Sequence, residues 1–163
     1  SAEIIQRDVS TIANTKSESV SALQSRVIVM GGAVIDLVAK PKTGSSLILG
    51  TSNPGICKEC DGGVGRNIAE VLSRLGIQPA LLSAVGSDTR GSSLVQRLTN
   101  ELGIETRIDV VEDSNTATYL ALLDYNGDLH TAIADMDVLQ KIRIPSEEVR
   151  FLHVYCTLQS VEY

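Results

Sequence analysis

Apolar residues along the chain fall into two patterns, short continuous runs and helical repeats. The run VIVMGGAVID (27–36) is rich in Val and Ile and ends in Gly-Gly and an acidic residue, which predicts a buried strand. Farther along, apolar positions recur at i, i+3, i+4 and i+7, which predicts an amphipathic helix ended by Gly76. These positions are Ile68, Val71, Leu72 and Leu75.

The same two patterns repeat downstream. PALLSAVG (79–86) predicts a second buried strand, and Asp88 can cap the helix that follows it. Gly103 closes that helix. Its predicted apolar face consists of Leu94, Val95, Leu98 and Leu102.

Of three further segments, one continues this alternation and two lie outside it. TRIDVV (106–111) continues it as a short strand, whereas 117–134 holds two apolar runs around Asn126-Gly127, a strong hairpin signal. Residues 37–60 contain short apolar pieces broken by Pro and Gly. Strands alternating with helices predict a parallel sheet with covered faces. Segment 37–60 and the hairpin do not fit it, so we expect an α/β domain in which they pair as a small β lid.

Composition narrows the function classes. The 163 residues suit one domain, and the net charge of −6 with only 3% aromatic residues disfavours a nucleic-acid polymer as partner. No apolar run approaches the roughly 18 residues of a membrane span, so we expect no membrane partner. Residues 1–25 are polar and read as a linker or N-terminal extension without a secretory signal. Three cysteines make no disulfide framework, which favours a cytoplasmic location.

The cysteines raise a metal alternative. Cys57 and Cys60 form a Cys-x-x-Cys, and His153 with Cys156 forms a His-x-x-Cys, so all four are zinc ligands by type. The two pairs lie about 90 residues apart in the sequence, and neither stands in a zinc-ribbon context. We therefore expect two unrelated pairs and no metal site, with a redox pair or zinc site as the alternative. His130 is expected on the surface of the hairpin.

The glycine turn DGGVGRN (61–67) leads directly into the first predicted helix. A dinucleotide fingerprint needs a third glycine where Ile68 stands, and no Walker A sequence occurs. Backbone N–H groups at such a helix start suit anions or hydroxyls. Asp36, at the predicted carboxyl end of the first strand, would share this edge with Asn67, and a carboxylate beside an amide suits a polyhydroxylated ligand such as a sugar. On the residues alone, a tight turn with ordinary caps explains the pattern as well.

The pattern Gly-Gly-x-Gly-x-Asn-x-Ala from Gly62, followed by Gly76 and Gly86, resembles the first signature of the PfkB (ribokinase-like) sugar and nucleoside kinases. Asp36, the VGSD at 85–88 and the NTATYLALLDYNGDL segment follow in the family's order. The sequence NPG…GGVGRNIAEVLSRLG is most similar to the pseudouridine kinase branch. The likeness covers residues 27 to about 142 and implies a ribokinase-like parallel-sheet sandwich with lid segments near 37–60 and 115–135.

The resemblance also implies roles. Asp36 and Asn67 would hold ribose hydroxyls, and Gly62 and Gly63 would hinge the lid. Asn53, Thr118 and Tyr119, on the lid segments, are further candidates for acceptor contacts. ATP with Mg²⁺, and in some members a monovalent cation, would serve phosphorylation of the 5′-hydroxyl of a nucleoside or sugar, pseudouridine above all. Ribokinase, fructokinase and adenosine kinase types are the alternatives.

One part of the family pattern is missing from these residues. The second signature, Gly-Ala-Gly-Asp, supplies the anion hole and the catalytic base in the family's C-terminal half, and no such stretch occurs here. We therefore assign no catalytic residue, expect the 163-residue chain alone to be inactive, and regard 143–163 as a divergent tail. The resemblance further implies a homodimer through the lid and, in some organisms, fusion to a pseudouridine-phosphate glycosidase. A noncatalytic fragment that pairs through its lid is the alternative of another class.

Overall fold

The strands form two separate four-stranded sheets, with the orders β5-β4-β1-β8 and β3-β2-β6-β7. The computed structural model describes residues 27–144, except 43 and 45, and the backbone of 154–157. The first, all-parallel sheet contains β1 (Ile28–Gly31), β4 (Ala80–Gly86), β5 (Glu105–Val111) and β8 (Val154–Thr157). This sheet confirms the predicted α/β class.

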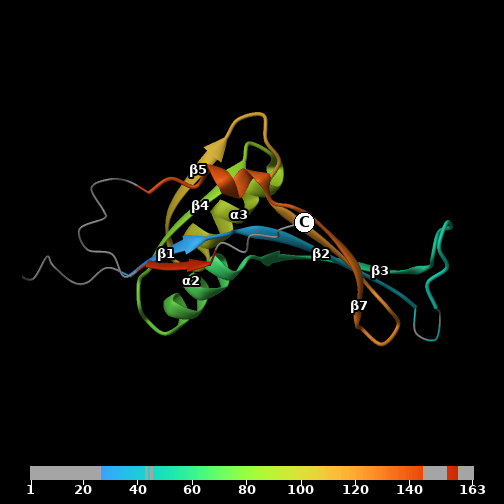
Figure 1. Ribbon diagram of the computed structural model, residues 1–163. Coiled ribbons are helices and arrows are strands. Elements are labelled where there is room, and N and C mark those ends of the chain that lie inside the picture. Colours follow the sequence, from blue (N-terminus) through green and yellow to red (C-terminus); the bar gives the residue numbers. More distant parts are fainter. Residues whose placement is uncertain (1–26, 43, 45, 145–153, 158–163) are drawn as a thin grey trace, which may run out of the picture.

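The second sheet, here called the lid sheet, projects away from the first (Figure 1). It contains β2 (Val34–Pro41), β3 (Gly55–Gly62), β6 (Thr118–Leu123) and β7 (Leu129–Asp135). Two antiparallel hairpins, β2–β3 and β6–β7, are joined by a parallel pairing of β2 with β6. The excursion and the hairpin therefore pair with each other outside the main sheet, as their sequences predict.

The predicted single strand over 27–36 is wrong, because the chain changes sheet in its middle. β1 ends at Gly31 and β2 begins at Val34, and the N–H of Ala33 donates to the buried hydroxyl of Ser83, 3.1 Å away. Both halves are buried, so the apolar run is continuous although the strand is not. Asp36 consequently lies on the lid sheet, in the third position of β2, rather than at the end of the first strand.

Two helices pack on one face of the main sheet. They are α2 (Val64–Arg74) and α3 (Thr89–Asn100), and their core cluster includes Ala69, Leu94 and Leu98 against Val29 and Leu81. The short 3-10 helix η1 (Asp137–Lys141) instead joins a cluster built around Val34, Ala84, Ala117 and Val138. α3 follows its predicted apolar face.

α2 follows its predicted apolar face only in part. Val71 and Leu75 are 56% and 71% exposed, whereas the helix buries Gly65 and Ala69. Gly65 explains this orientation, because a Cβ there would lie only 2.7 Å from the backbone carbonyl carbon of Gly31. The helix thus approaches the end of β1 backbone to backbone. Ile68 and Leu72 of the predicted face still pack against the core, whereas Val71 and Leu75 turn outward.

The β6–β7 connection confirms the predicted hairpin with a longer loop than Asn126-Gly127 alone. The Asp124 carboxylate accepts hydrogen bonds from the N–H groups of Asn126, Gly127 and Asp128 at 2.8–3.0 Å. At the other end of the described chain, β8 lies parallel to β1 within the segment 143–163. No helix among the described residues is both long and apolar enough to cross a bilayer.

Candidate functional site

The centre of the site is the contact between Asp36 and the glycine turn. Asp36 lies on β2 opposite Cys60 of β3, and Gly62 ends β3 two pairs farther on. A Cβ built on Gly62 would lie 2.0 Å from Oδ2 of Asp36, so the carboxylate lies directly against the Gly62 backbone. Any side chain at Gly62 would displace the carboxylate. The structure thus brings together two residues that lie far apart in the sequence.

Gly63 continues the turn into α2. Its φ of +91° lies in the left-handed region, and a Cβ there would meet the carbonyl oxygen of Gly32 at 2.3 Å. That same oxygen accepts a hydrogen bond from the N–H of Arg66 at 3.1 Å. The break between β1 and β2 and the start of α2 therefore form one tightly packed backbone corner, with Asp36 beside it.

The Asp36 carboxylate is half-buried and accepts no hydrogen bond from any of the residues that the structure describes. Burial raises the pKa of Asp36, and the positive charge of Arg66 works in the opposite direction. A partly desolvated carboxylate with unused acceptor positions is unfavourable without a partner. It is therefore suited to accept hydrogen bonds from a ligand's hydroxyl groups.

Asn67 is exposed in the first turn of α2, and both Asn67 and Asp36 interact with Arg66. Its side-chain oxygen accepts a hydrogen bond from Nη2 of Arg66 at 2.5 Å. Arg66 also pairs with Glu70, its Nη1 lying 2.7 Å from Oε2. Arg66 is not among the residues that the sequence predicts for the site. A basic residue in the first turn of a helix is nevertheless recognisable as unusual, because it opposes the helix dipole.

The strand pairing places Tyr119 and Thr118 differently. Tyr119 of β6 is the register partner of Asp36, so both lie on the same face of the lid sheet. Thr118 precedes Tyr119 and so belongs to the opposite face, where its hydroxyl donates to the carbonyl of Thr116 at 3.0 Å. The sheet therefore groups Tyr119, but not Thr118, with Asp36.

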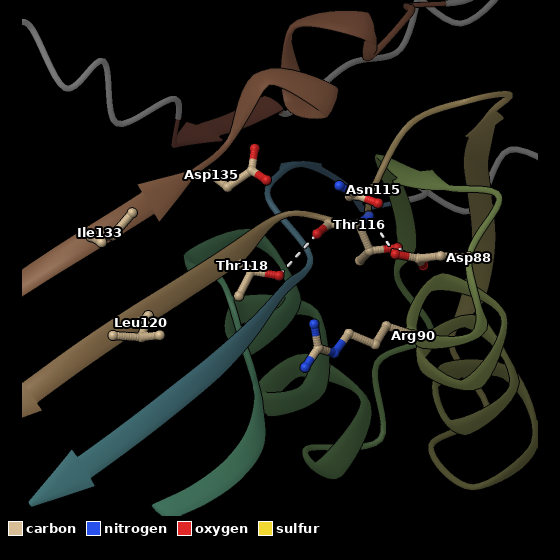
Figure 2. Close-up of a pocket in the computed structure, with 8 residues that line it drawn as sticks. All are labelled: Asp88, Arg90, Asn115, Thr116, Thr118, Leu120, Ile133 and Asp135. Carbon is tan, nitrogen blue, oxygen red and sulfur yellow. Dashed lines mark hydrogen bonds between the residues drawn. The ribbon is translucent and has the colours of Figure 1, made fainter. Parts of the chain in front are cut away.

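Thr118 lines a cavity of about 320 Å³ between the lid sheet and the start of α3 (Figure 2). Polar and apolar side chains share its wall, and Asp88 is engaged there by hydrogen bonds from Thr116. This cavity lies on the opposite face of the lid sheet from Asp36, so it is distinct from the Asp36 corner. Its lining is Asp88, Arg90, Asn115, Thr116, Thr118, Leu120, Ile133 and Asp135.

Asn53 lies at the distal end of the β2–β3 hairpin. Its amide bonds the N–H and carbonyl of Ile48 at 2.8 and 2.9 Å and so organises the loop locally. The hairpin pairs Gly55 with Pro41 but Cys60 with Asp36. Five residues of strand, roughly 17 Å at about 3.4 Å each, thus separate that end from Asp36. The structure does not bring Asn53 to the other predicted contacts.

Two ion pairs fasten the lid strand β3 to α3. Arg97 binds the Asp61 carboxylate through two nitrogens, with Nε 2.7 Å from Oδ2. The hydrogen bond that Arg97 donates to Asp61 raises the pKa of Arg97. Arg90 pairs with Glu59 at 3.1 Å in a more exposed position. Both acidic residues lie close to Gly62, so they fix the orientation of the strand that carries the glycine turn.

Cys57 and Cys60 are free, exposed and three residues apart on β3, so their side chains project from opposite faces of the strand. Among the described residues, no group of three or more His, Cys, Asp or Glu side chains is arranged to hold a metal ion. His153 and the side chain of Cys156 lie outside the described residues. His130 is exposed on β7, where the sequence predicts it.

The chain is similar in sequence to several known proteins. The sequence profile described as pfkB family carbohydrate kinase matches residues 24–157, beyond the 142 at which the visible likeness ends. The chain is 44% identical over 117 residues to a pseudouridine kinase of Escherichia coli, covering 71% of this chain and 36% of that protein. It is 33% identical to a pseudouridine-metabolizing bifunctional protein of Schizosaccharomyces pombe, covering 72% and 16%.

Among solved structures, a carbohydrate kinase from Agrobacterium tumefaciens superimposes with a TM-score of 0.62 at 34% identity. The match covers 69% of this chain and 36% of that one. The chain thus spans about a third of the length of this structure and of the Escherichia coli protein.

Proposed function

Because this chain belongs to the pfkB family of carbohydrate kinases, we propose that it is the acceptor-binding part of an ATP-dependent kinase for pseudouridine. The product would be pseudouridine 5′-phosphate. The observation that carries the proposal is the half-buried Asp36 carboxylate, which lies against Gly62 and accepts no hydrogen bond from the described residues. The similarity to pseudouridine kinases supports the choice of nucleoside.

The corner offers complementary chemistry to a ribose. The ionised Asp36 carboxylate can only accept hydrogen bonds, whereas the Asn67 amide can both donate and accept. Two neighbouring hydroxyls of a sugar can donate to the first and accept from the second. Tyr119 lies on the same face of the lid sheet and adds an aromatic surface beside this pair. Gly62 and Gly63 would let the lid sheet move over the bound nucleoside.

Phosphoryl transfer needs more than this corner. It depends on a metal-bound nucleotide, stabilisation of the transferring phosphoryl group and a base for the attacking hydroxyl. Asp88 is unsuited as that base, because its oxygens already accept hydrogen bonds from Gly91 and from the N–H and hydroxyl of Thr116. We therefore assign the base to a Gly-Ala-Gly-Asp segment in the C-terminal half of the complete kinase. We assign the sites of ATP, Mg²⁺ and a monovalent cation to the same half, and expect this chain alone not to turn over.

A second candidate function rests on the lid sheet. Leu120 and Ile133 are 41% and 69% exposed on adjacent strands, and an exposed apolar strand surface favours pairing with another chain. A homodimer through the lid is compatible with the kinase proposal. It would also be the whole function of a noncatalytic fragment. As part of the kinase proposal, we also expect a cytoplasmic location and, in the parent protein, fusion to a pseudouridine-phosphate glycosidase.

Titration calorimetry of the 163-residue chain tests the acceptor. Pseudouridine should bind about five- to tenfold more tightly than uridine, because it presents one more N–H on its base and one hydrogen bond contributes about 1 kcal/mol. Tighter binding of ribose, fructose or adenosine would assign the chain to another kinase type. If none of them binds and light scattering shows concentration-dependent association, the noncatalytic alternative is correct. A coupled ADP-release assay with ATP and Mg²⁺ should show no turnover by the chain alone.

A further inference from the structure

Arg66 occupies a position that is unfavourable for a cation. It lies in the first turn of α2, where the helix dipole repels positive charge, and its side chain is only 12% exposed. Its Nε atom is buried without a hydrogen-bond partner among the described residues. A buried, unpaired donor is also unfavourable. We therefore looked for a function that compensates for this unfavourable position, and the side chains that contact Arg66 indicate one.

The two remaining nitrogens of the guanidinium fix the side chains around it. Nη1 pairs with Glu70, which also binds Arg74 through Oε1 at 2.6 Å, so Glu70 anchors Arg66 from the next turn of the helix. Nη2 donates to the side-chain oxygen of Asn67. Because a guanidinium has donors only, the Asn67 amide must turn its oxygen toward Arg66. Its NH₂ group is then the part left to face a ligand.

We propose that Arg66 is the positioning residue that makes Asn67 and Asp36 a donor–acceptor pair of fixed polarity. The proposal rests on the function proposed above. With Arg66 in place, the corner presents a carboxylate that accepts and an amide that donates. A vicinal diol satisfies both groups, with one hydroxyl as donor and its neighbour as acceptor. A ligand with two acceptors at these positions, such as a 2-oxo acid, is rejected by the carboxylate.

The charge of Arg66 serves the same pair. It opposes the effect of burial on the pKa of Asp36 and so favours the ionised form of the carboxylate, which accepts hydrogen bonds. The other titratable groups near Asp36 are Cys60 and Lys58 on β3 and Tyr119 on β6, by their register positions. Glu70 adds a negative charge on the far side of Arg66. Arg66 thus connects the polarity of Asn67 to the protonation of Asp36.

The test combines a charge-removing and a charge-keeping variant. In Arg66→Met the midpoint of the Asp36 titration, followed by carboxyl carbon NMR of the free chain, should move to higher pH. Pseudouridine affinity measured above that midpoint should fall about tenfold, since the amide is no longer oriented. Arg66→Lys keeps the charge but lacks the fork, so it should restore most of the titration midpoint and little of the affinity.

Arg74→Met is the matched control, because it removes the same charge from the same helix at the other partner of Glu70. It should change neither the titration nor the affinity. An unchanged Asp36 midpoint in Arg66→Met, or full affinity in Arg66→Lys, would overturn the proposal. The titration needs no ligand, so it tests the effect of Arg66 on Asp36 even if pseudouridine is not the acceptor. Thermal unfolding of each variant separates misfolding from these effects.

Discussion

Asp88 should be the most consequential acidic residue for stability in the described part of the chain. Its carboxylate caps α3 by accepting from the N–H of Gly91 at 2.8 Å, and it also accepts from the N–H and hydroxyl of Thr116 at 2.9 and 2.6 Å. Thr116 is 1% exposed and lies two residues before the lid strand β6. One side chain therefore ties the start of a helix to the entry into the lid sheet.

Replacing Asp88 by Ala removes all of these acceptors at once. Loss of an N-cap costs about 1 kcal/mol, and leaving the buried polar groups of Thr116 unpaired costs about 1–3 kcal/mol. We expect Asp88→Ala to lower the free energy of unfolding by about 2–4 kcal/mol. For a chain of this size the melting temperature should fall by about 5–15 °C. Urea unfolding followed by far-ultraviolet circular dichroism measures the change.

The pH dependence provides a second, independent check. Burial works to raise the pKa of Asp88, but the hydrogen bonds from Thr116 and Gly91 outweigh it and hold the pKa below its ordinary value of 3.8. A carboxyl with a lowered folded pKa stabilises the protein above its unfolded pKa and loses that contribution as the pH falls through the folded one. The difference in free energy of unfolding between wild type and Asp88→Ala should therefore become smaller below about pH 4.

Asp137→Ala is the matched control, since Asp137 is exposed in the first turn of η1 and should change stability by no more than about 0.5 kcal/mol. Thr116→Val completes a double-mutant cycle with Asp88→Ala, and a coupling of about 1–2 kcal/mol is expected. An Asp88→Ala variant as stable as Asp137→Ala, or a gap that widens in acid, would refute the reasoning.

The remaining predictions concern the glycine turn and the cysteines. Gly62→Ala should weaken pseudouridine binding by at least about tenfold in calorimetry, because its Cβ would displace the Asp36 carboxylate. Gly50→Ala, which is strained by a φ of +76° but lies in open space at the lid tip, should leave the affinity unchanged, and equal effects of both variants would contradict this. The chain purified without chelator should contain no bound zinc by elemental analysis, and Cys57→Ser should unfold like wild type; one zinc per chain would show otherwise.

Local signals in the sequence were sufficient for α3 and for the β6–β7 hairpin. The Asp88 cap and the spacing of Leu94 and Leu98 predict α3 and its buried face, since a helix that covers a sheet must bury one stripe. The Asn126-Gly127 pair predicts the β6–β7 hairpin. Because segment 37–60 and the hairpin do not fit the alternation, the sequence predicts that they pair as a lid, but no local signal says which of their strands are neighbours.

The sheet switch between Gly31 and Val34 could not be predicted from the apolar pattern. Strands of both sheets are buried there, so the run continues without a polar break. Which face of the lid sheet Thr118 and Tyr119 occupy follows from the pairing of β2 with β6, a contact between distant segments. Arg66 differs from these features, because the sequence alone shows a cation in the first turn of the predicted helix, where it is unfavourable.

The central claim is that Asp36 binds a ribose hydroxyl, and an isosteric variant tests it most directly. Asp36→Asn keeps the shape of the side chain against Gly62 but replaces a charged acceptor by a neutral amide. Titration calorimetry of wild type and Asp36→Asn with pseudouridine should show a loss of about 1–3 kcal/mol in binding free energy, roughly five- to 150-fold in affinity. Equal affinity of the two proteins, each folded by circular dichroism, would remove Asp36 from the site and contradict the account.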